Sequence, residues 1–327
     1  MNKLEQLPKP FFVLAPMDDV TDTVFRQVVA DCAAPDLYFT EFVNVDGLQS
    51  PGRGRLLKKL QFVGSEKNLV AQLWGLKPEN FQKTAEQIVD GTFAREFGLP
   101  EGANFVGIDL NMGCPAKSEV KSGACAALIN NRELAVEIIK ATQAGAGDIP
   151  VSVKTRLGFN EVDLSWHELL LQQNLSMLTI HGRTRKEMSK VPAHWDIIGQ
   201  VRELRDKLAP GTLIVGNGDV MTHQQGLELA TEHQLDGIMI GRGIFQDPYV
   251  FAVESPWEER SKEQRIALYA KHVQLFSETW DEAERRIATL NKFCKVYING
   301  FDGAKEMREQ LMNAASTQDL LKLLHSS

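Results

Sequence analysis

The sequence has few cysteines and no long apolar run, and each absence excludes a class of protein. Its 327 residues include four cysteines, which lie far apart and form no C-x-x-C pair. A disulfide framework or a structural zinc site is therefore not expected, and a reducing cytoplasm is the expected location. No stretch approaches the ~20 apolar residues that span a bilayer. The N-terminus, MNKLEQLPKPFF, lacks the basic and apolar parts of a signal peptide.

The composition has no strong bias either. Hydrophobic residues make up 43% of the chain and charged residues 24%, with 25 glycines and 13 prolines, which excludes collagen-like, coiled-coil and disordered chains. The formal net charge is -7, from 36 Lys and Arg against 43 Asp and Glu. This acidic balance argues at first against a nucleic-acid partner. The length permits one large α/β domain with a smaller one.

Eight short apolar runs, each ending in a polar or glycine-rich turn, predict eight strands. Their nearly continuous apolar character is typical of parallel strands that are buried on both faces. Helix-start signals lie between most of them, at Asp22, Pro78 and Thr222 among others. Eight β-then-α units predict a TIM (β/α)8 barrel rather than a doubly wound sheet. The strands are predicted at 11–17, 37–43, 69–75, 105–111, 151–156, 177–183, 212–219 and 236–242.

After Pro256 the pattern is that of helices alone. Apolar residues recur at spacings of three and four, and Gly300 and Gly303 separate the last two segments. The linker VESPWEERS carries the proline and the charges expected at a domain boundary. We therefore expect a barrel domain over 1–254 and a small helical domain over 255–327.

Six of the predicted strands end in polar or glycine residues, at the end of the barrel where TIM-barrel chemistry is located. Glycine-rich turns after the last two strands could hold a phosphate through backbone N–H groups, or could simply make tight turns. Arg242 could add a charge-assisted bond to such a phosphate. The strand-end residues are Pro16, Met17, Gln72, Asn111, Lys154, Arg156, His181, Asn217, Gly218, Asp219, Gly241 and Arg242.

Three of the candidate residues allow more than one interpretation. Lys154 could be a Schiff-base nucleophile, a cation for an anionic ligand, or a surface lysine; inside a barrel it needs an anionic or electron-rich partner. His181 could be a core histidine or a ligand contact. Cys114 follows a strand end between Gly113 and Pro115, where a thiol can act as a nucleophile or a general acid. Cys125 is interpreted as packing.

Several motifs together resemble the tRNA-dihydrouridine synthase family. D-x-N-x-GCP is specific to that family among flavin barrels, and the matches follow the family's order along the whole barrel and into its helical tRNA-binding domain. The motifs are APM-x-x-V-TD-x-x-FR at 15–26, TEFV at 40–43, DLNMGCPAK at 109–117, VKTRLG at 153–158, TIHGRTR at 179–185, NGD at 217–219, IGRG at 240–243 and NKFCKVYINGFDGAKEMREQL at 291–311.

The resemblance implies an enzyme that reduces the C5–C6 double bond of particular tRNA uridines, with FMN and NADPH or NADH. Cys114 would be the general acid that protonates C5 while flavin N5 delivers hydride to C6, and Asn111 and Arg156 would bind the uracil. The expected partners are tRNA and a nicotinamide dinucleotide, without metal or membrane, and the expected state is a monomer. Pro16, Met17 and Gln72 would line the flavin ring with Lys154 near its edge, and His181, Asn217, Gly218, Asp219, Gly241 and Arg242 would hold the ribityl chain and phosphate.

Two features depart from the family or have no explanation in it. Asp18 and Asp19 stand where many relatives carry a small residue or glycine, which puts a backbone contact to the flavin at Asp18 in doubt. Residues 91–104 lengthen the approach to the fourth strand without an evident function.

Three other functions fit parts of the pattern. One is a flavin barrel that reduces a small pyrimidine or enone, although a small substrate would not need the helical tail. Another is a Schiff-base aldolase built on Lys154, and a third is a non-catalytic RNA-binding protein. The distribution of charge bears on the RNA partner, because residues 255–327 hold 11 basic and 11 acidic residues and the barrel carries the whole -7. Basic segments at 53–67, 183–190 and 285–308 could follow a tRNA backbone or be ordinary solvated faces.

Overall fold

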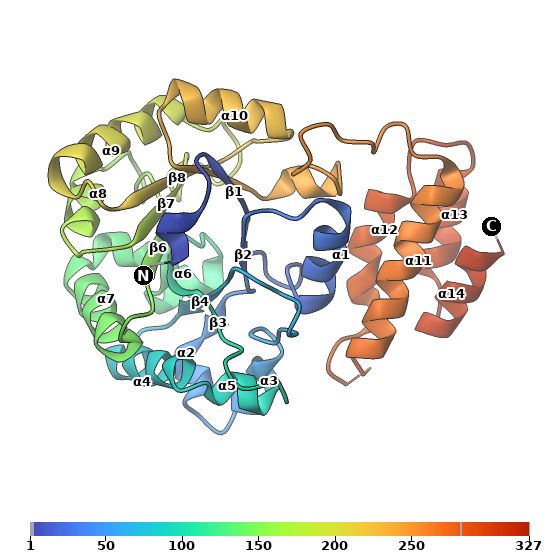
Figure 1. Ribbon diagram of the computed structural model, residues 1–327, viewed down its shortest axis with the longest axis horizontal. Coiled ribbons are helices and arrows are strands. Elements are labelled where there is room, and N and C mark those ends of the chain that lie inside the picture. Colours follow the sequence, from blue (N-terminus) through green and yellow to red (C-terminus); the bar gives the residue numbers. More distant parts are fainter. Residues whose placement is uncertain (1–2, 282, 327) are drawn as a thin grey trace.

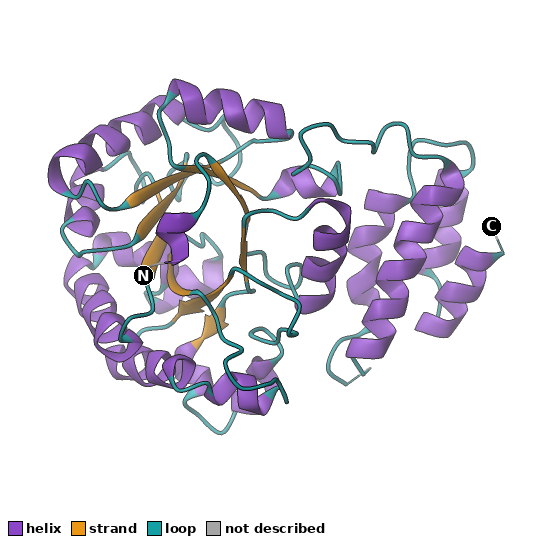
Figure 2. Cartoon of the chain, in the orientation of Figure 1, coloured by secondary structure: helices purple, strands orange, loops and turns teal. Residues whose placement is uncertain are grey.

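Eight parallel strands close into a barrel in the computed structural model, which describes residues 3–281 and 283–326 (Figure 1). Neighbouring strands pair in chain order, and the ring closes because the first strand also pairs with the last. Figure 2 shows the ring of strands with helices outside it, which confirms the predicted TIM barrel. The strands are β1 (Phe11–Leu14), β2 (Leu37–Phe39), β4 (Leu69–Trp74), β5 (Gly107–Met112), β6 (Val151–Arg156), β7 (Met177–His181), β8 (Leu213–Asn217) and β9 (Gly237–Ile240).

The strand predicted at 37–43 is interrupted, which corrects the sequence-based prediction. It divides into β2 and a two-residue strand, β3 (Val43–Asn44), which pairs with the end of β4. Between them, the Thr40 hydroxyl accepts a hydrogen bond from the backbone N–H of Gln72 at 3.0 Å and donates to the backbone carbonyl of Glu41 at 2.7 Å. At this break the Glu41 side chain meets Arg285 of the C-terminal segment, together with Lys59 and the Asp19 N–H of the barrel.

Helices cover the outside of the barrel, and the predicted start signals are confirmed. Asp22 and Thr222 cap α1 and α10 with side-chain hydrogen bonds, and Pro78 is the first residue of α4. The long covering helices are α1 (Thr23–Ala33), α4 (Pro78–Val89), α7 (Arg132–Ala146), α8 (Leu164–Leu171), α9 (Trp195–Leu208) and α10 (His223–Glu232). The short segments are η1 (Lys3–Gln6), α2 (Val45–Leu48), α3 (Arg53–Leu57), α5 (Thr92–Glu96), α6 (Lys117–Ser122), η2 (Cys125–Asn130) and η3 (Arg242–Phe245).

The stretch 91–104 packs on the outside of the barrel, away from the strand ends. Its α5 buries Phe93, and the Arg53 guanidinium lies 4.9 Å from the centre of that ring. Arg53 also forms an ion pair with Glu96 at 2.8 Å. Through these two contacts, Arg53 connects α3 to α5.

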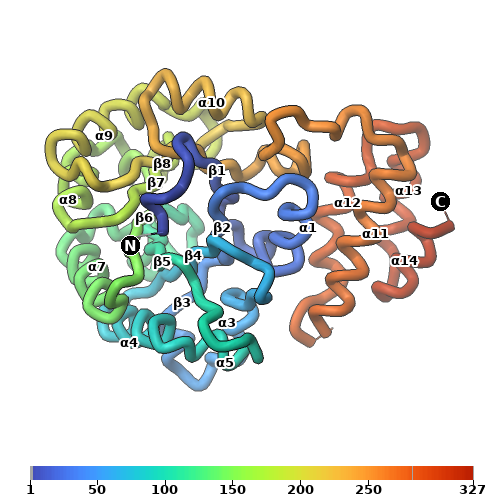
Figure 3. The backbone as a smooth tube through the Cα atoms, in the orientation of Figure 1, coloured from blue at the N-terminus to red at the C-terminus, as the bar shows by residue number. Residues whose placement is uncertain are grey.

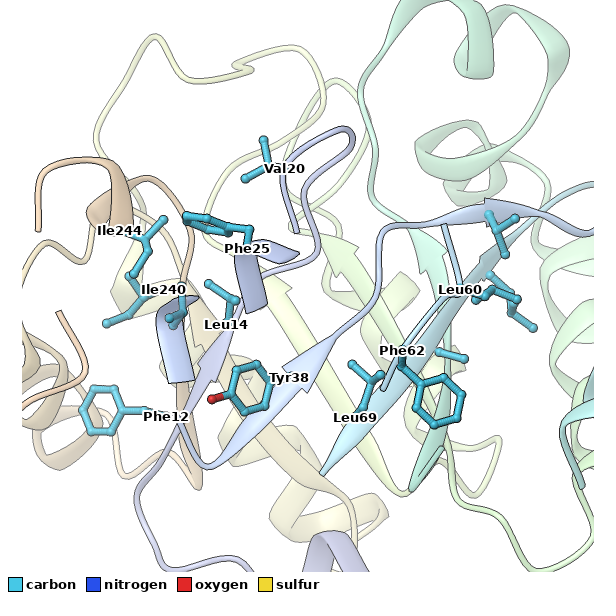
Figure 4. Close-up of a cluster of buried hydrophobic side chains, with 14 of the residues drawn as sticks. Phe12, Leu14, Val20, Phe25, Tyr38, Leu60, Phe62, Leu69, Ile240 and Ile244 are labelled. Atoms are coloured by element: carbon cyan, nitrogen blue, oxygen red, sulfur yellow. The ribbon is translucent and has the colours of Figure 1, made fainter. Parts of the chain in front are cut away.

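Apolar side chains fill both sides of the strands. Inside the barrel, alternate residues such as Phe11, Val13 and Met239 form one cluster. The residues between them, such as Phe12 and Leu14, face the helices and belong to a larger cluster, part of which Figure 4 shows. This alternation is why the strands read as continuous apolar runs in the sequence.

The C-terminal helices stand beside the barrel, with α11 next to α1 (Figure 3). The pattern at 281–300 becomes helical only at Asn291, after a turn and a 3-10 segment; residue 282 lies outside the described residues. Gly300 and Gly303 have φ of 74° and 80° and separate the last segments as predicted. The elements are α11 (Lys262–Thr279), η4 (Ile287–Leu290), α12 (Asn291–Tyr297), α13 (Ala304–Met312) and α14 (Thr317–His325). The division at 254 into two domains stays a prediction.

A buried ionic cluster joins these helices to the barrel. The Arg285 guanidinium, whose side chain is 3% exposed, forms an ion pair with Glu41, which is fully buried, and lies 3.5 Å from the Asp22 carboxylate. The Trp280 indole N–H donates to the same Asp22 oxygen, Oδ2, at 3.0 Å. Arg285 begins the basic segment 285–308 that could follow a tRNA backbone, but it is buried in this junction and cannot contact RNA.

Among the described residues, no helix is both long and apolar enough to cross a membrane.

Candidate active site

The predicted cofactor residues, apart from Gln72, line one cavity of about 240 Å³ at the C-terminal ends of the strands. Strand register brings them together, because Arg156 pairs with His181 across β6 and β7, and His181 with Asn217 across β7 and β8. The cavity is lined by Pro16, Met17, Lys154, His181, Asn217, Gly218, Asp219, Gly241 and Arg242, together with Arg156, Ala15, Val220, Met221 and Met239. Parallel strands thus gather into one site side chains that are far apart in the sequence.

Two polar groups in this cavity lack a protein partner. Among the described residues, the Lys154 ammonium makes no hydrogen bond or ion pair, and the buried Nδ1 of His181 has no hydrogen-bond partner. Burial, with the nearby charge of Arg156, lowers the pKa of Lys154 to about 8. Burial also lowers the pKa of His181, so its imidazole is neutral. A half-buried cation and an unpaired ring nitrogen are suited to an electron-rich or anionic ligand.

Asp219 lies at the end of β8 between two arginines. Its carboxylate accepts from Arg242 at 2.8 Å and forms an ion pair with the buried Arg183. In the described part of the chain, Arg183 Nη1 is buried without a hydrogen-bond partner. This arrangement keeps the Arg242 guanidinium at the cavity, where an anion could bind, with the buried Arg183 on the other carboxylate oxygen of Asp219.

The glycines of the last two turns have a packing role of their own. A Cβ on Gly218, whose φ is +139°, would lie 2.7 Å from Ala193 Cβ, and a Cβ on Gly243 would lie 2.6 Å from the carbonyl oxygen of Val220. Gly241 is less confined, with its nearest neighbour at 3.5 Å. Tight turns therefore suffice to explain Gly218 and Gly243, and a phosphate contact at these turns stays a prediction.

Gln72 and Asn111 belong to a hydrogen-bonded chain beside the cavity. Gln72 Nε2 donates to the buried Asp109 carboxylate at 2.7 Å, and Asn111 Nδ2 donates to Gln72 Oε1 at 3.2 Å. Asn111 Oδ1 then accepts from the backbone N–H of Gly113 at 3.1 Å and of Cys114 at 2.9 Å. The asparagine predicted to bind uracil thus also anchors the backbone of Cys114.

Cys114 is half-buried and its thiol is tuned by a second cysteine. A hydrogen bond from the Cys125 thiol, opposed by burial, lowers the pKa of Cys114 to about 7, while the pKa of Cys125 is raised well above its ordinary value. Cys125 is buried at the start of η2, as its packing interpretation requires, and has a φ of +54°. The Ala126 N–H also donates to the Cys114 carbonyl at 3.3 Å. Cys125 therefore has a second role besides packing, because its hydrogen bond lowers the pKa of Cys114.

Arg156 holds the loops around Cys114. Its Nε donates to the Gly113 carbonyl at 2.8 Å, and its Nη1 donates to the carbonyls of Thr184 and Met188 at 3.1 and 3.2 Å. Within the described residues, its Nη2 has no hydrogen-bond partner, so one nitrogen is left for a ligand. The role in uracil binding predicted for Arg156 stays a prediction.

Neither Asp18 nor Asp19 lines the cavity, and Asp19 contacts the C-terminal segment, where its carboxylate lies 3.7 Å from Arg285. Asp18 pairs with Lys59, the Asp19 N–H donates to Glu41 at 2.7 Å, and Lys292 donates to the Asp19 carbonyl at 2.5 Å. The departure from the family pattern thus contributes to the junction with the helices.

Sequence reasoning missed four residues that shape the site. Asp109 lies in the DLNMGCPAK motif and Arg183 in the TIHGRTR motif, but the sequence-based prediction gives neither residue a role. Ser152 alternates along β6 with Lys154, which is a signal that it faces the barrel interior. Only the contact of Cys125 with Cys114 lacked any signal in the sequence, because it depends on how the loop between them folds back.

The fold and the site define a class, a TIM-barrel protein with a polar ligand cavity and a tuned thiol at its strand ends. A family model described as "Dihydrouridine synthase (Dus)" matches residues 13–326. A probable tRNA-dihydrouridine synthase of Staphylococcus aureus (strain COL) is 45% identical over 326 residues, which are 99% of this chain and 94% of the relative. Probable tRNA-dihydrouridine synthase 2 of Bacillus subtilis (strain 168) is 44% identical over 327 residues, 99% of this chain and 95% of the relative.

Among solved structures, the chain resembles morphinone reductase with a TM-score of 0.47 and 10% sequence identity, over 73% of this chain and 84% of that one. The family match and the curated relatives together show that the chain belongs to the dihydrouridine synthase family, a family of oxidoreductases.

Proposed function

We propose that this protein reduces the C5–C6 double bond of particular uridines in tRNA, with FMN as its cofactor and NADPH or NADH as the reductant. The observation that carries the proposal is the placement of the Cys114 thiol, anchored by Asn111, at the strand ends that also form a cavity with an unpaired Lys154. The family membership supports the reaction type, and two relatives carry tRNA-dihydrouridine synthase in their names.

The residues of the cavity fit a flavin mononucleotide. Lys154 and the unpaired Nδ1 of His181 suit electron-rich atoms of a flavin, and Arg242 suits its phosphate, with the buried Arg183 adding positive charge behind Asp219. When bound, FMN would supply the hydride that is added to C6 of the uracil. Pro16 and Met17 would line the ring from the end of β1, and Asn217, Gly218, Asp219 and Gly241 would lie along the ribityl chain and phosphate.

Cys114 would then donate the proton to C5. An acid works best when its pKa is close to the working pH, and hydrogen bonding from Cys125 brings the pKa of Cys114 to about 7. The thiol therefore gives up its proton more readily than an ordinary cysteine while still being protonated in a large share of molecules. Negative charge that develops on the uracil would be stabilised by the second N–H of Asn111 and by Arg156 Nη2.

Reaching the flavin requires the uridine to leave its stack in the tRNA. The basic residues that remain exposed are suited to the RNA backbone. On the C-terminal helices they are Arg286, Lys295 and Lys305, and on the barrel Arg55 and Lys67 on one side and Lys186 and Lys190 on the other. Others are engaged within the protein: Lys58 donates to the Glu284 carbonyl and Lys59 pairs with Asp18. A cytoplasmic location and a monomeric state stay predictions.

The test begins with the purified full-length protein. We expect it to be yellow, with absorbance near ~450 nm after loading with FMN, and to form dihydrouridine in tRNA from a strain that lacks the modification. The variant Cys114→Ala should retain FMN and its reduction by NADPH and lose most dihydrouridine formation. A colourless protein that cannot be loaded with FMN would refute the proposal, and unchanged tRNA reduction by Cys114→Ala would remove the thiol from the mechanism.

A further inference from the structure

Beneath the site, a chain of side-chain hydrogen bonds runs from the barrel interior to Cys114. It starts at Asp109, which is fully buried and whose two carboxylate oxygens accept from Ser152 Oγ at 2.5 Å and from Gln72 Nε2 at 2.7 Å. It continues through the amides of Gln72 and Asn111 and ends at the backbone of Cys114. Nothing in the catalytic scheme above uses Asp109.

The direction of every bond in this chain follows from its two ends. An ionised carboxylate can only accept, so Gln72 must turn its NH2 group toward Asp109 and its oxygen toward Asn111. Asn111 must then donate through Nδ2, which leaves Oδ1 to accept from the N–H groups of Gly113 and Cys114. If either amide were reversed, two NH2 groups would face each other, or Asn111 would present hydrogens to backbone N–H groups.

We propose that Asp109 is a positioning residue, which sets the orientation of the Gln72 and Asn111 amides and thereby the acceptor that anchors Cys114. The proposal rests on the proposed function only in assigning Cys114 its catalytic part. Burial raises the pKa of Asp109 to about 6, against the effect of its bonds to Ser152 and Gln72 and of Lys154. The carboxylate is therefore mostly ionised at neutral pH, as an acceptor at this end of the chain must be.

The proposal predicts a specific coupling between positions 109 and 111, because the Gln72 amide bridges their side chains. In Asn111→Asp, two carboxylates compete for the single NH2 group of Gln72, and while both are ionised the glutamine oxygen must face one of them; exchange is therefore compared above pH 8, where proton uptake by one carboxyl is least. In the double variant Asp109→Asn with Asn111→Asp, every bond can reverse, because the new amide at position 109 donates to Gln72 and Gln72 donates to the new carboxylate at position 111. That carboxylate still accepts from Gly113 and Cys114.

The coupling between positions 109 and 111 can be tested directly by amide hydrogen exchange. The exchange is measured for the peptide that contains Gly113 and Cys114, on the full chain without FMN. We expect Asn111→Asp to speed exchange at these amides by at least about tenfold and to lower the thermal midpoint. The double variant should recover most of the protection, and Asp109→Asn alone should lie between the native protein and Asn111→Asp, because an amide at position 109 can offer Gln72 either an oxygen or an NH2 group and no longer fixes the direction of the chain. The control Ser152→Ala removes a donor to Asp109 without reversing the chain and should leave exchange at 113 and 114 nearly unchanged.

Additive effects, with the double variant exchanging at least as fast as Asn111→Asp, would overturn the proposal, and so would native protection in Asn111→Asp alone. If Asn111→Asp fails to fold, recovery of a folded double variant is the expected result on a coarser scale. Failure of both, while Asp109→Asn folds, would contradict the coupling. These measurements do not depend on tRNA reduction, so their outcome is separate from that of the proposed function.

Discussion

Replacing Arg285 with methionine should destabilise the protein through the junction between the barrel and the C-terminal helices. The substitution keeps an apolar stem of similar length but leaves the buried carboxylate of Glu41 without its main partner. Removing one member of a buried ion pair costs about 3–5 kcal/mol. Lys59 lies 3.6 Å from Glu41 and the Asp19 N–H still donates to it, so we expect the lower end of this range, about 3 kcal/mol.

The loss should depend on pH in a defined direction. Burial raises the pKa of Glu41 above its ordinary value although Arg285 and Lys59 oppose the shift. Without Arg285 this pKa rises further. A carboxyl whose pKa is raised in the folded state destabilises progressively as the pH rises from its unfolded-state pKa toward its folded-state pKa. The variant should therefore be less stable at pH 7 than at pH 5, and its deficit relative to the native protein should shrink as the pH falls.

Urea unfolding followed by tryptophan fluorescence suits this measurement, because the Arg285 guanidinium lies 4.9 Å from the centre of the Trp280 ring. The matched control is Arg286→Met, the same change at the next, exposed residue, which should stay within about 0.5 kcal/mol of the native protein. Equal stabilities for the two variants at pH 7, or a deficit of Arg285→Met that grows as the pH falls, would show that the buried pair does not stabilise the junction in this way.

Two further predictions concern the thiol and the turns. The rate of Cys114 alkylation by iodoacetamide should rise with pH with a midpoint of about 7, and Cys125→Ala should move that midpoint up, because the bond that stabilises the thiolate is lost; an unmoved midpoint would exclude Cys125 as its cause. Gly243→Ala should cost about 1–3 kcal/mol, because its Cβ would meet the Val220 carbonyl, whereas Gly54→Ala, in an open helical position, should be neutral or stabilising. Equal unfolding free energies for these two variants would contradict the packing argument.

Local patterns in the sequence were sufficient for the barrel and for most of the cavity. Strand periodicity and helix caps such as Asp22 and Thr222 depend on residues close in sequence, and in a TIM barrel the strand ends necessarily meet. That is why Lys154, His181 and Asn217, taken from three strands, line one cavity. The interruption at Glu41 was not predictable in the same way, because Arg285, the residue that pairs with the Glu41 side chain there, lies 244 residues away in the sequence.

The charge of a residue was a poor guide to its exposure where burial depends on a partner far away in the sequence. Arg285 lies in a basic segment that suggests a solvated or RNA-facing surface, and only its carboxylate partners on the barrel explain why it is buried. The lowered pKa of Cys114 could not be predicted for a related reason. Cys125 is an isolated cysteine in a helix-start pattern, and nothing in the sequence indicates that its thiol contacts the thiol of Cys114. Asp109 was visible within a motif, but its role depends on the orientations of two amides, which sequence does not show.

The proposed function depends above all on Cys114 protonating a tRNA uridine as hydride is added to it. This step can be tested by mapping dihydrouridine across the tRNAs of a strain that lacks this gene, complemented either with the native chain or with Cys114→Ala. The native chain should restore dihydrouridine at defined positions, and Cys114→Ala, present at equal level, should restore little or none. Full restoration by Cys114→Ala would contradict the role of the thiol, and no loss of dihydrouridine on deleting the gene would contradict the proposed function.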